Sequence, residues 1–293
     1  MRRTDPPPSP RRSSRRRRGF ALAVLILAAA FALDLNAPAI VVVAALIPAT
    51  AFTALIAWFE RRSPLPWLPM LAALLWGGTV AALGALLVND FAGRILANGM
   101  VATLIAPLVE EACKASALVV LLLVWNDAWR DVREGMIYGA LVGVGFAATE
   151  NLGYYVLAAV QDGPPGLARA LYLRGVLEGL NHAAFTAMIG AGAGYARGAY
   201  CAFRGARLWV TLSAFLLAVA THALWNLSVS PRITAILCNA SQAGGACATA
   251  PDAADLLLHV PALIVVFLGP VAALLFVFAR QAERGAAQEG WRR

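Results

Sequence analysis

The sequence predicts an all-α membrane protein: a polytopic helix bundle of about eight transmembrane helices, with both termini in the cytoplasm. Three observations predict it. Of the 293 residues, 60% are hydrophobic and only 14% are charged, against about a quarter charged in soluble domains. Long apolar stretches recur along the chain, and arginines flank them unevenly. This composition excludes a cytosolic globule and a disordered chain, and four cysteines are too few for a disulfide scaffold.

The apolar stretches give the predicted helices in chain order, because about 20 apolar residues cross the hydrocarbon of a bilayer. Six hold at most one Asp, Glu, Lys or Arg, namely Glu150 in the fourth: Gly19–Leu33, which is short, Asn36–Phe59, Ser63–Asn89, Gly135–Gln161, Leu208–Pro231 and Leu256–Ala279. Two more, Ile95–Asn126 and Gly175–Ala196, carry a few ionisable residues in their middles.

Arginine placement predicts the orientation. With the N-terminus inside, inner segments hold eleven arginines and outer segments four, before the eight arginines of the first eighteen residues are counted. Excess basic residues mark cytoplasmic loops. We therefore expect a disordered Arg/Pro-rich cytoplasmic tail over 1–18, a transmembrane bundle over 19–280 and a cytoplasmic tail over 281–293, in the cell membrane.

The excess of basic residues is concentrated in the N-terminal tail and does not form a binding face on the bundle, which argues against nucleic acid as a partner. Whether Cys238 and Cys247 of the outer loop pair is left open.

Ionisable residues inside the apolar stretches are the candidate site, because each costs about 3 kcal/mol or more to insert. The candidates and one amide fall on four predicted helices: Glu110, Glu111 and Lys114, then Glu150, then His182 with Glu178, and finally His222 and Asn226. His259 lies near the outer end of the last stretch and is expected to be an interfacial histidine.

Spacing orders these residues. Glu110 and Lys114 are four apart and are expected to share a helix face, whereas Glu111 is turned away by about 100°. Lys114 is the single lysine of a chain that otherwise uses arginine. Counted from the predicted outer ends, four of the side chains lie six to eleven residues deep, roughly 9–17 Å at 1.5 Å per residue. A shared level predicts one polar pocket in the outer half of the membrane. For Glu178, an ion pair with Arg174 is the simpler expectation.

These motifs resemble those of the PrsW family of intramembrane proteases. The matching residues run in order along four helices: Glu110-Glu111-x-x-Lys114, Phe146-x-x-x-Glu150-Asn151, His182 with Gly190, and His222-x-x-x-Asn226. The related CAAX prenyl endopeptidases carry EExxxR and FxxxH instead, so the sequence sides with PrsW.

The resemblance implies hydrolysis of a peptide bond in a membrane-protein substrate near the outer face, the family's type activity being the first cut of an anti-sigma factor. We expect Glu110, or else Glu111, to be the general base, with Glu150 and His182 completing the water site. His222 and Asn226 are candidate oxyanion donors, and Lys114 holds the glutamates.

The metal question is left open by the sequence. The family is called a metalloprotease, and His182, His222 and Glu150 are plausible zinc ligands. No HExxH helix occurs in the chain. We expect a metalloprotease, with a metal-free glutamate mechanism as the alternative.

Other classes of function remain as alternatives. Buried Glu, His and Lys residues also serve proton-coupled transporters, although no repeated halves are found. A CAAX-type prenyl-protein endopeptidase and a non-catalytic membrane scaffold are further alternatives.

Overall fold

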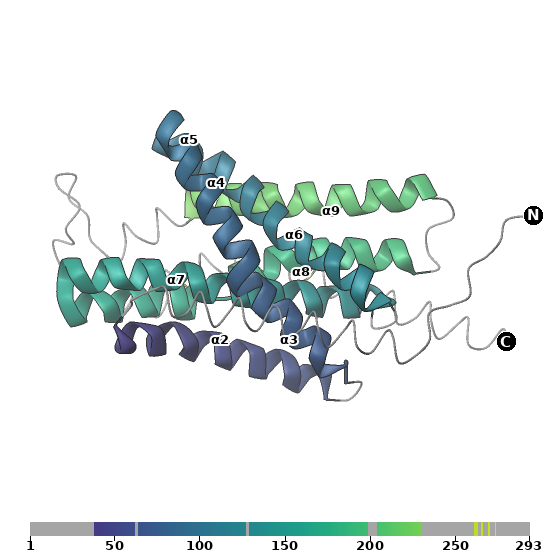
Figure 1. Cartoon of the computed structure of the whole chain (residues 1–293), viewed down its shortest axis with the longest axis horizontal. Coiled ribbons are helices and arrows are strands. Elements are labelled where there is room, and N and C mark those ends of the chain that lie inside the picture. The colour runs from purple at the N-terminus through teal and green to yellow at the C-terminus, as the bar shows by residue number, and fades with distance from the viewer. Residues whose placement is uncertain are drawn as a thin grey trace, which may run out of the picture.

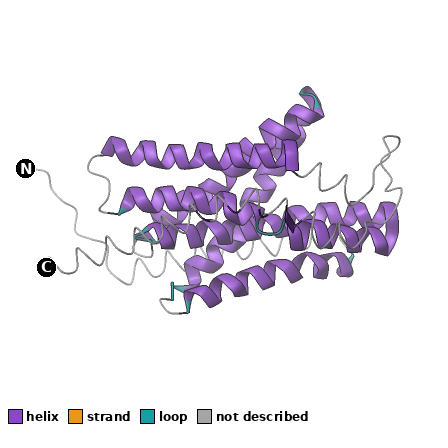
Figure 2. Cartoon of the chain, turned by 180° about the vertical axis from the view of Figure 1, so that it is seen from behind, coloured by secondary structure: helices purple, strands orange, loops and turns teal. Residues whose placement is uncertain are grey.

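The described residues form helices only. The computed structural model describes residues 38–61, 64–126, 129–198 and 204–229, with a few positions between 261 and 273. Within these ranges no strand occurs (Figure 2). The elements in chain order are α2 (Ala39–Glu60), α3 (Trp67–Trp76), the π-helical η1 (Gly77–Ala81), α4 (Ala82–Ile95), α5 (Asn98–Met100), π-helical η2 (Val101–Ile105), α6 (Ala106–Val124), α7 (Val132–Ala170), π-helical η4 (Leu171–Leu177), α8 (Asn181–Arg197), α9 (Arg204–Leu224) and π-helical η5 (Trp225–Val229). The predicted all-α class is confirmed.

The helices form an elongated bundle with α7 at its centre. α2, α7, α8 and α9 extend along the long axis, and α4 crosses them obliquely (Figure 1). α2, α3 and α8 all pack against α7. The largest buried cluster includes Trp129, Tyr138, Leu141 and Phe185, so the core lies around α7 and α8.

Three of the described helices are long and apolar enough to cross a membrane: Ala39–Glu60, Trp67–Ile95 and Gly205–Leu227. They coincide with three of the predicted spans. α6 falls outside this group because Glu110, Glu111 and Lys114 interrupt its apolar run, and α8 has only 17 residues. The count of eight spans therefore stays a prediction.

Glycines set the register of the antiparallel pair α7 and α8. A Cβ on Gly143 would lie 2.2 Å from the His182 carbonyl oxygen, and one on Gly139 would lie 2.4 Å from that of Thr186. One turn further, Gly135 and Gly190 face each other, since a Cβ on Gly190 would lie 2.0 Å from the Gly135 carbonyl oxygen. The small-xxx-small spacings Gly139–Gly143 and Gly190–Gly194 of the sequence thus serve helix packing.

The α7–α8 connection differs from the two continuous spans that the sequence predicts. The chain reverses at Gly163, whose φ of 64° favours glycine, directly before Pro164 and Pro165. η4 then runs back along α7, and the helix is interrupted over residues 178–180 before α8 begins at Asn181. Gly179 sits in the interruption, where a Cβ would lie 2.4 Å from the Phe52 ring of α2. Broken helices occur at membrane depth where protein covers them or they line a cavity.

Several predicted features lie outside the described residues. They are the Arg/Pro-rich tail, the span Gly19–Leu33, most of the span Leu256–Ala279, the tail 281–293 and the loop with Cys238 and Cys247.

The glycine contacts predict that Gly143→Ala destabilises the protein. A methyl group there must push α7 and α8 apart, which we expect to lower the free energy of unfolding by about 1–3 kcal/mol. Thermal unfolding of the purified protein in detergent measures the change. Gly153→Ala is the matched control on the same helix, because a Cβ there meets no atom within 4 Å. Equal stability of the two variants would contradict the packing described.

Candidate active site

A buried ion pair on α6 lies at the centre of the polar residues. Lys114 Nζ donates to Glu111 Oε1 at 2.6 Å, and both side chains have no solvent exposure. The ammonium also lies 3.0 Å from His182 Nδ1 and 4.3 Å from the centroid of the Phe146 ring. The expected pairing of Lys114 with Glu110 is therefore replaced by a pairing with Glu111. Residues three apart are also neighbours on a helix, and Glu110 is turned towards the cavity described below.

Glu111 is fully engaged by three helices. Besides Lys114, its Oε1 lies 3.0 Å from His222 Nδ1 on α9, and its Oε2 accepts from Thr186 Oγ1 on α8 at 3.2 Å. A carboxylate with this many partners is an anchor for the bundle. Thr186 was missed by sequence reasoning, although it lies four residues after His182 and hence on the same face of α8.

Glu110 has far fewer polar contacts than Glu111. Its Oε1 accepts a long hydrogen bond of 3.4 Å from Asn89 Nδ2 on α4. Its Oε2 is buried without a hydrogen-bond partner and lies 3.8 Å from His222 Nε2, beyond hydrogen-bond reach. The two adjacent glutamates thus divide into one saturated carboxylate and one with an available oxygen, which agrees with the expected 100° turn between them.

Glu150 faces this group from α7. Its Oε2 lies 2.8 Å from His182 Nε2 and 3.0 Å from a terminal nitrogen of Arg174, neither contact having hydrogen-bond alignment. Arg174 also donates from Nε to Asn151 Oδ1 at 2.9 Å and stacks on Tyr154. Sequence reasoning gave Arg174 only its pairing with Glu178, which is confirmed at 3.6 Å, and missed its contact with Glu150.

Aromatic rings enclose the two histidines. The His182 and His222 rings meet edge to face with their centroids 5.2 Å apart, and Phe185 stacks on His222 at 4.9 Å. Both histidines are buried. The rings fix the orientation of each imidazole: both nitrogens of His222 face carboxylates, whereas His182 faces a carboxylate with Nε2 and the Lys114 ammonium with Nδ1.

Asn226 forms no hydrogen bond with the cluster of glutamates, histidines and Lys114. Its Nδ2 donates to the backbone oxygen of Ala102 at 3.0 Å, which ties η5 to η2. The other six predicted site residues are linked by the contacts above, whereas the expected oxyanion role of Asn226 has no such contact in support.

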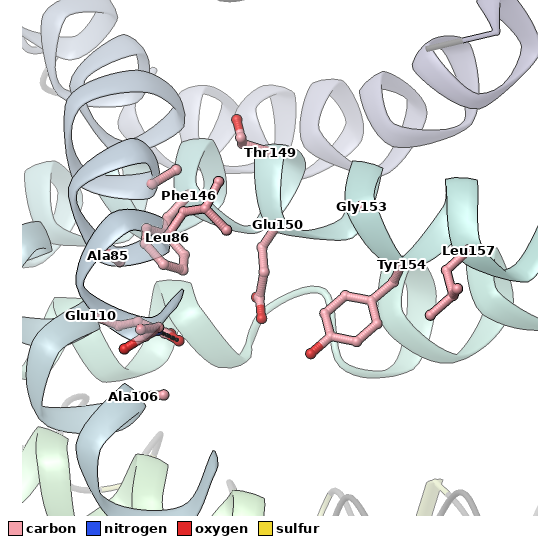
Figure 3. A pocket seen from close by; sticks show the side chains of 12 residues that line it. Ala85, Leu86, Ala106, Glu110, Phe146, Thr149, Glu150, Gly153, Tyr154 and Leu157 are labelled. Atoms are coloured by element: carbon pink, nitrogen blue, oxygen red, sulfur yellow. Dashed lines mark hydrogen bonds between the residues drawn. The ribbon is translucent and has the colours of Figure 1, made fainter. Parts of the chain in front are cut away.

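A cavity of about 450 Å³ opens beside Glu110 and Glu150. It lies between α4, α6 and α7, and Glu150 and Tyr154 point into it from α7 (Figure 3). Asn89 also lines it. A peptide placed there would meet both carboxylates.

Three residues of the group could hold a metal ion. Glu110, His182 and His222 each offer a ligand atom, and these atoms lie within 4.8 Å of one another. Two imidazoles and a carboxylate form the ligand set of several catalytic zinc sites. The unpartnered Glu110 Oε2 fits this use, and so does the local charge, since four carboxylates surround Lys114 and Arg174. Glu110 here takes the place that the sequence analysis gave to Glu150.

Comparison with known proteins identifies the family. The model of the PrsW family of intramembrane metalloproteases matches residues 65–268, well over half of the chain. The chain belongs to this family. No curated protein and no solved structure matches it.

The protein is thus a PrsW-family intramembrane metalloprotease, a hydrolase, and the resemblance seen in the sequence is confirmed. The matched range contains every predicted site residue, from Glu110 on α6 to Asn226 on η5. It also contains Asn89, Arg174 and Thr186, which only the fold connects to the site.

Proposed function

We propose that this PrsW-family protein hydrolyses a peptide bond of a membrane-protein substrate in the cavity between α4, α6 and α7, with a water molecule activated by Glu110. The observation that carries the proposal is the buried Glu110 Oε2, which has no hydrogen-bond partner and lies beside both histidines and the cavity. Glu111 is less suited to this role, because Lys114, His222 and Thr186 already occupy its oxygens.

Hydrolysis requires three functions of the site: removal of a proton from water, stabilisation of the oxyanion and protonation of the leaving amine. Glu110 accepts the proton as the water oxygen bonds to the carbonyl carbon, and later returns it to the amine as the C–N bond breaks. The Asn89 amide is the side-chain donor nearest to Glu110. His222 donates from Nδ1 to Glu111, so its Nε2, 3.8 Å from Glu110, donates only when the ring is an imidazolium. Lys114 keeps Glu111 and His182 in place throughout.

A zinc ion, when bound, would supply positive charge that makes water easier to deprotonate. Glu110, His182 and His222 are the residues that would hold it. In that case Glu150, 2.8 Å from His182, is the carboxylate available to move the proton. Glu110 is indispensable under either arrangement.

The setting in the membrane follows from the sequence. We propose eight spans over 19–280, cytoplasmic tails over 1–18 and 281–293, and a site in the outer half of the cell membrane. The described helices support this in that three are long and apolar enough to span. A substrate cut near the outer face, such as an anti-sigma factor, suits this placement.

Glu110→Gln is expected to abolish cleavage, by a factor of at least about 100, because an amide cannot take a proton from water. The substitution keeps the shape of the side chain, so insertion and folding should persist. Comparing membrane proteomes of cells carrying the wild-type and variant chains would reveal an uncut membrane protein that accumulates only with the variant.

The matched control is Asp90→Asn, an acid-to-amide change on the exposed side of α4. It should cleave like wild type. Full activity of a Glu110→Gln, Glu111→Gln double variant would refute the proposal.

Zinc content separates the two arrangements. The zinc-bound arrangement predicts about one zinc per purified chain, lost in His182→Ala and in His222→Ala and retained in Glu150→Gln, as measured by elemental analysis. It also predicts that chelation removes the activity and that zinc restores it. Full activity in rigorously zinc-free protein would instead establish the metal-free arrangement, with Glu110 as the base.

A further inference from the structure

The cavity wall formed by α7 consists of two parallel rows of residues. Residues four apart lie on the same face of a helix. One row is Phe146, Glu150 and Tyr154, and the other is Thr149, Gly153 and Leu157. Figure 3 shows Gly153 between the turns that carry Glu150 and Leu157. A position without a side chain thus lies three residues from a carboxylate of the site.

Helix packing does not require a glycine at position 153. A Cβ on Gly153 would meet no atom within 4 Å, whereas one on Gly145 of the same helix would lie 1.9 Å from the Leu74 carbonyl oxygen. Glycine also disfavours a helix interior relative to alanine. Its presence at 153 therefore calls for a reason other than close packing, and the cavity that it lines supplies one.

The walls opposite α7 include three alanines beside the larger Leu86 and Asn89. Ala82 and Ala85 of α4 and Ala106 of α6 line the cavity near Glu110. Small side chains on three helices leave about 450 Å³ of space next to the carboxylates, within the range of ligand pockets. Apart from five polar residues, the lining is apolar, so the space suits an apolar group. The polar ones are Asn89, Glu110, Thr149, Glu150 and Tyr154.

We infer that Gly153 sets the size of a subsite that receives an apolar side chain of the substrate next to the scissile bond. The inference rests on the proposed function, because only a peptide bound beside Glu110 and Glu150 would place a side chain there. A substituent at position 153 projects into the space that this side chain fills. The bulk of residue 153 then decides which residues the protease accepts.

The test uses the full-length chain in liposomes with a pool of synthetic single-span peptides. The apolar stretch of each peptide is randomised among Ala, Val, Leu and Phe, and mass spectrometry identifies the residues beside each cut bond. Wild type, Gly153→Ala, Gly153→Leu, Glu110→Gln and the control Gly93→Leu are compared. Gly93 is the matched control, since a Cβ there also meets no atom within 4 Å, but it does not line the cavity.

We expect Gly153→Leu to lower cutting beside Leu and Phe at least about tenfold relative to cutting beside Ala. Gly153→Ala should shift the ratio in the same direction by less, and Gly93→Leu should match wild type. Thermal unfolding verifies that each variant is folded. If Gly153→Leu does not fold, the cutting ratio of Gly153→Ala tests the subsite instead.

Wild-type ratios in folded Gly153→Leu, or an equal loss beside all four residues, would overturn the subsite while leaving the proposed function intact. A pool that wild type and Glu110→Gln leave equally uncut would contradict the proposed function itself, and the subsite with it.

Discussion

The ion pair between Lys114 and Glu111 is the interaction on which the rest of the site depends. In a chain that lies in lipid, a charged group must find its partners within the protein. Glu111 does so with a lysine of its own helix, a threonine of α8 and a histidine of α9. Because the same lysine contacts His182 and the Phe146 ring, one pair on α6 holds α7, α8 and α9 at a single level. Its neighbour Glu110 keeps one buried oxygen that has no hydrogen-bond partner.

Glycine packing brings the remaining groups to this level. The close approach of Gly143 to His182 fixes how far α7 slides along α8. Glu150, two turns beyond Gly143, then lies past the start of α8 and reaches His182 Nε2. The interruption at residues 178–180 lets α8 begin there, and the antiparallel return of η4 brings Arg174 back beside Asn151 and Glu150. The helix contacts and the polar contacts therefore specify the same register.

Much of the site follows from the sequence, because polar residues in apolar helices are few and their spacing is strict. The all-α class follows from the length of the apolar stretches, the grouping of Lys114 with two histidines from their shared depth, and the different surroundings of Glu110 and Glu111 from helix periodicity. Thr186, Asn89 and the second role of Arg174 do not, since each depends on how helices distant in sequence are rotated and shifted against each other. Asn226 has a helix spacing that suits the site, yet its amide bonds to Ala102. The break before α8 was missed because Gly175–Ala196 is long and mostly apolar, which predicts one continuous span despite Glu178 and His182.

The central claim is that Glu110 activates a water molecule that cuts a peptide bond in this pocket. Isotope incorporation tests it most directly: the purified protein is given single-span peptides in water enriched in ¹⁸O, and the products are examined by mass spectrometry. The account predicts one ¹⁸O atom in each newly formed carboxyl group with wild type, and no such product with Glu110→Gln. Labelled product formed equally by Glu110→Gln would contradict it.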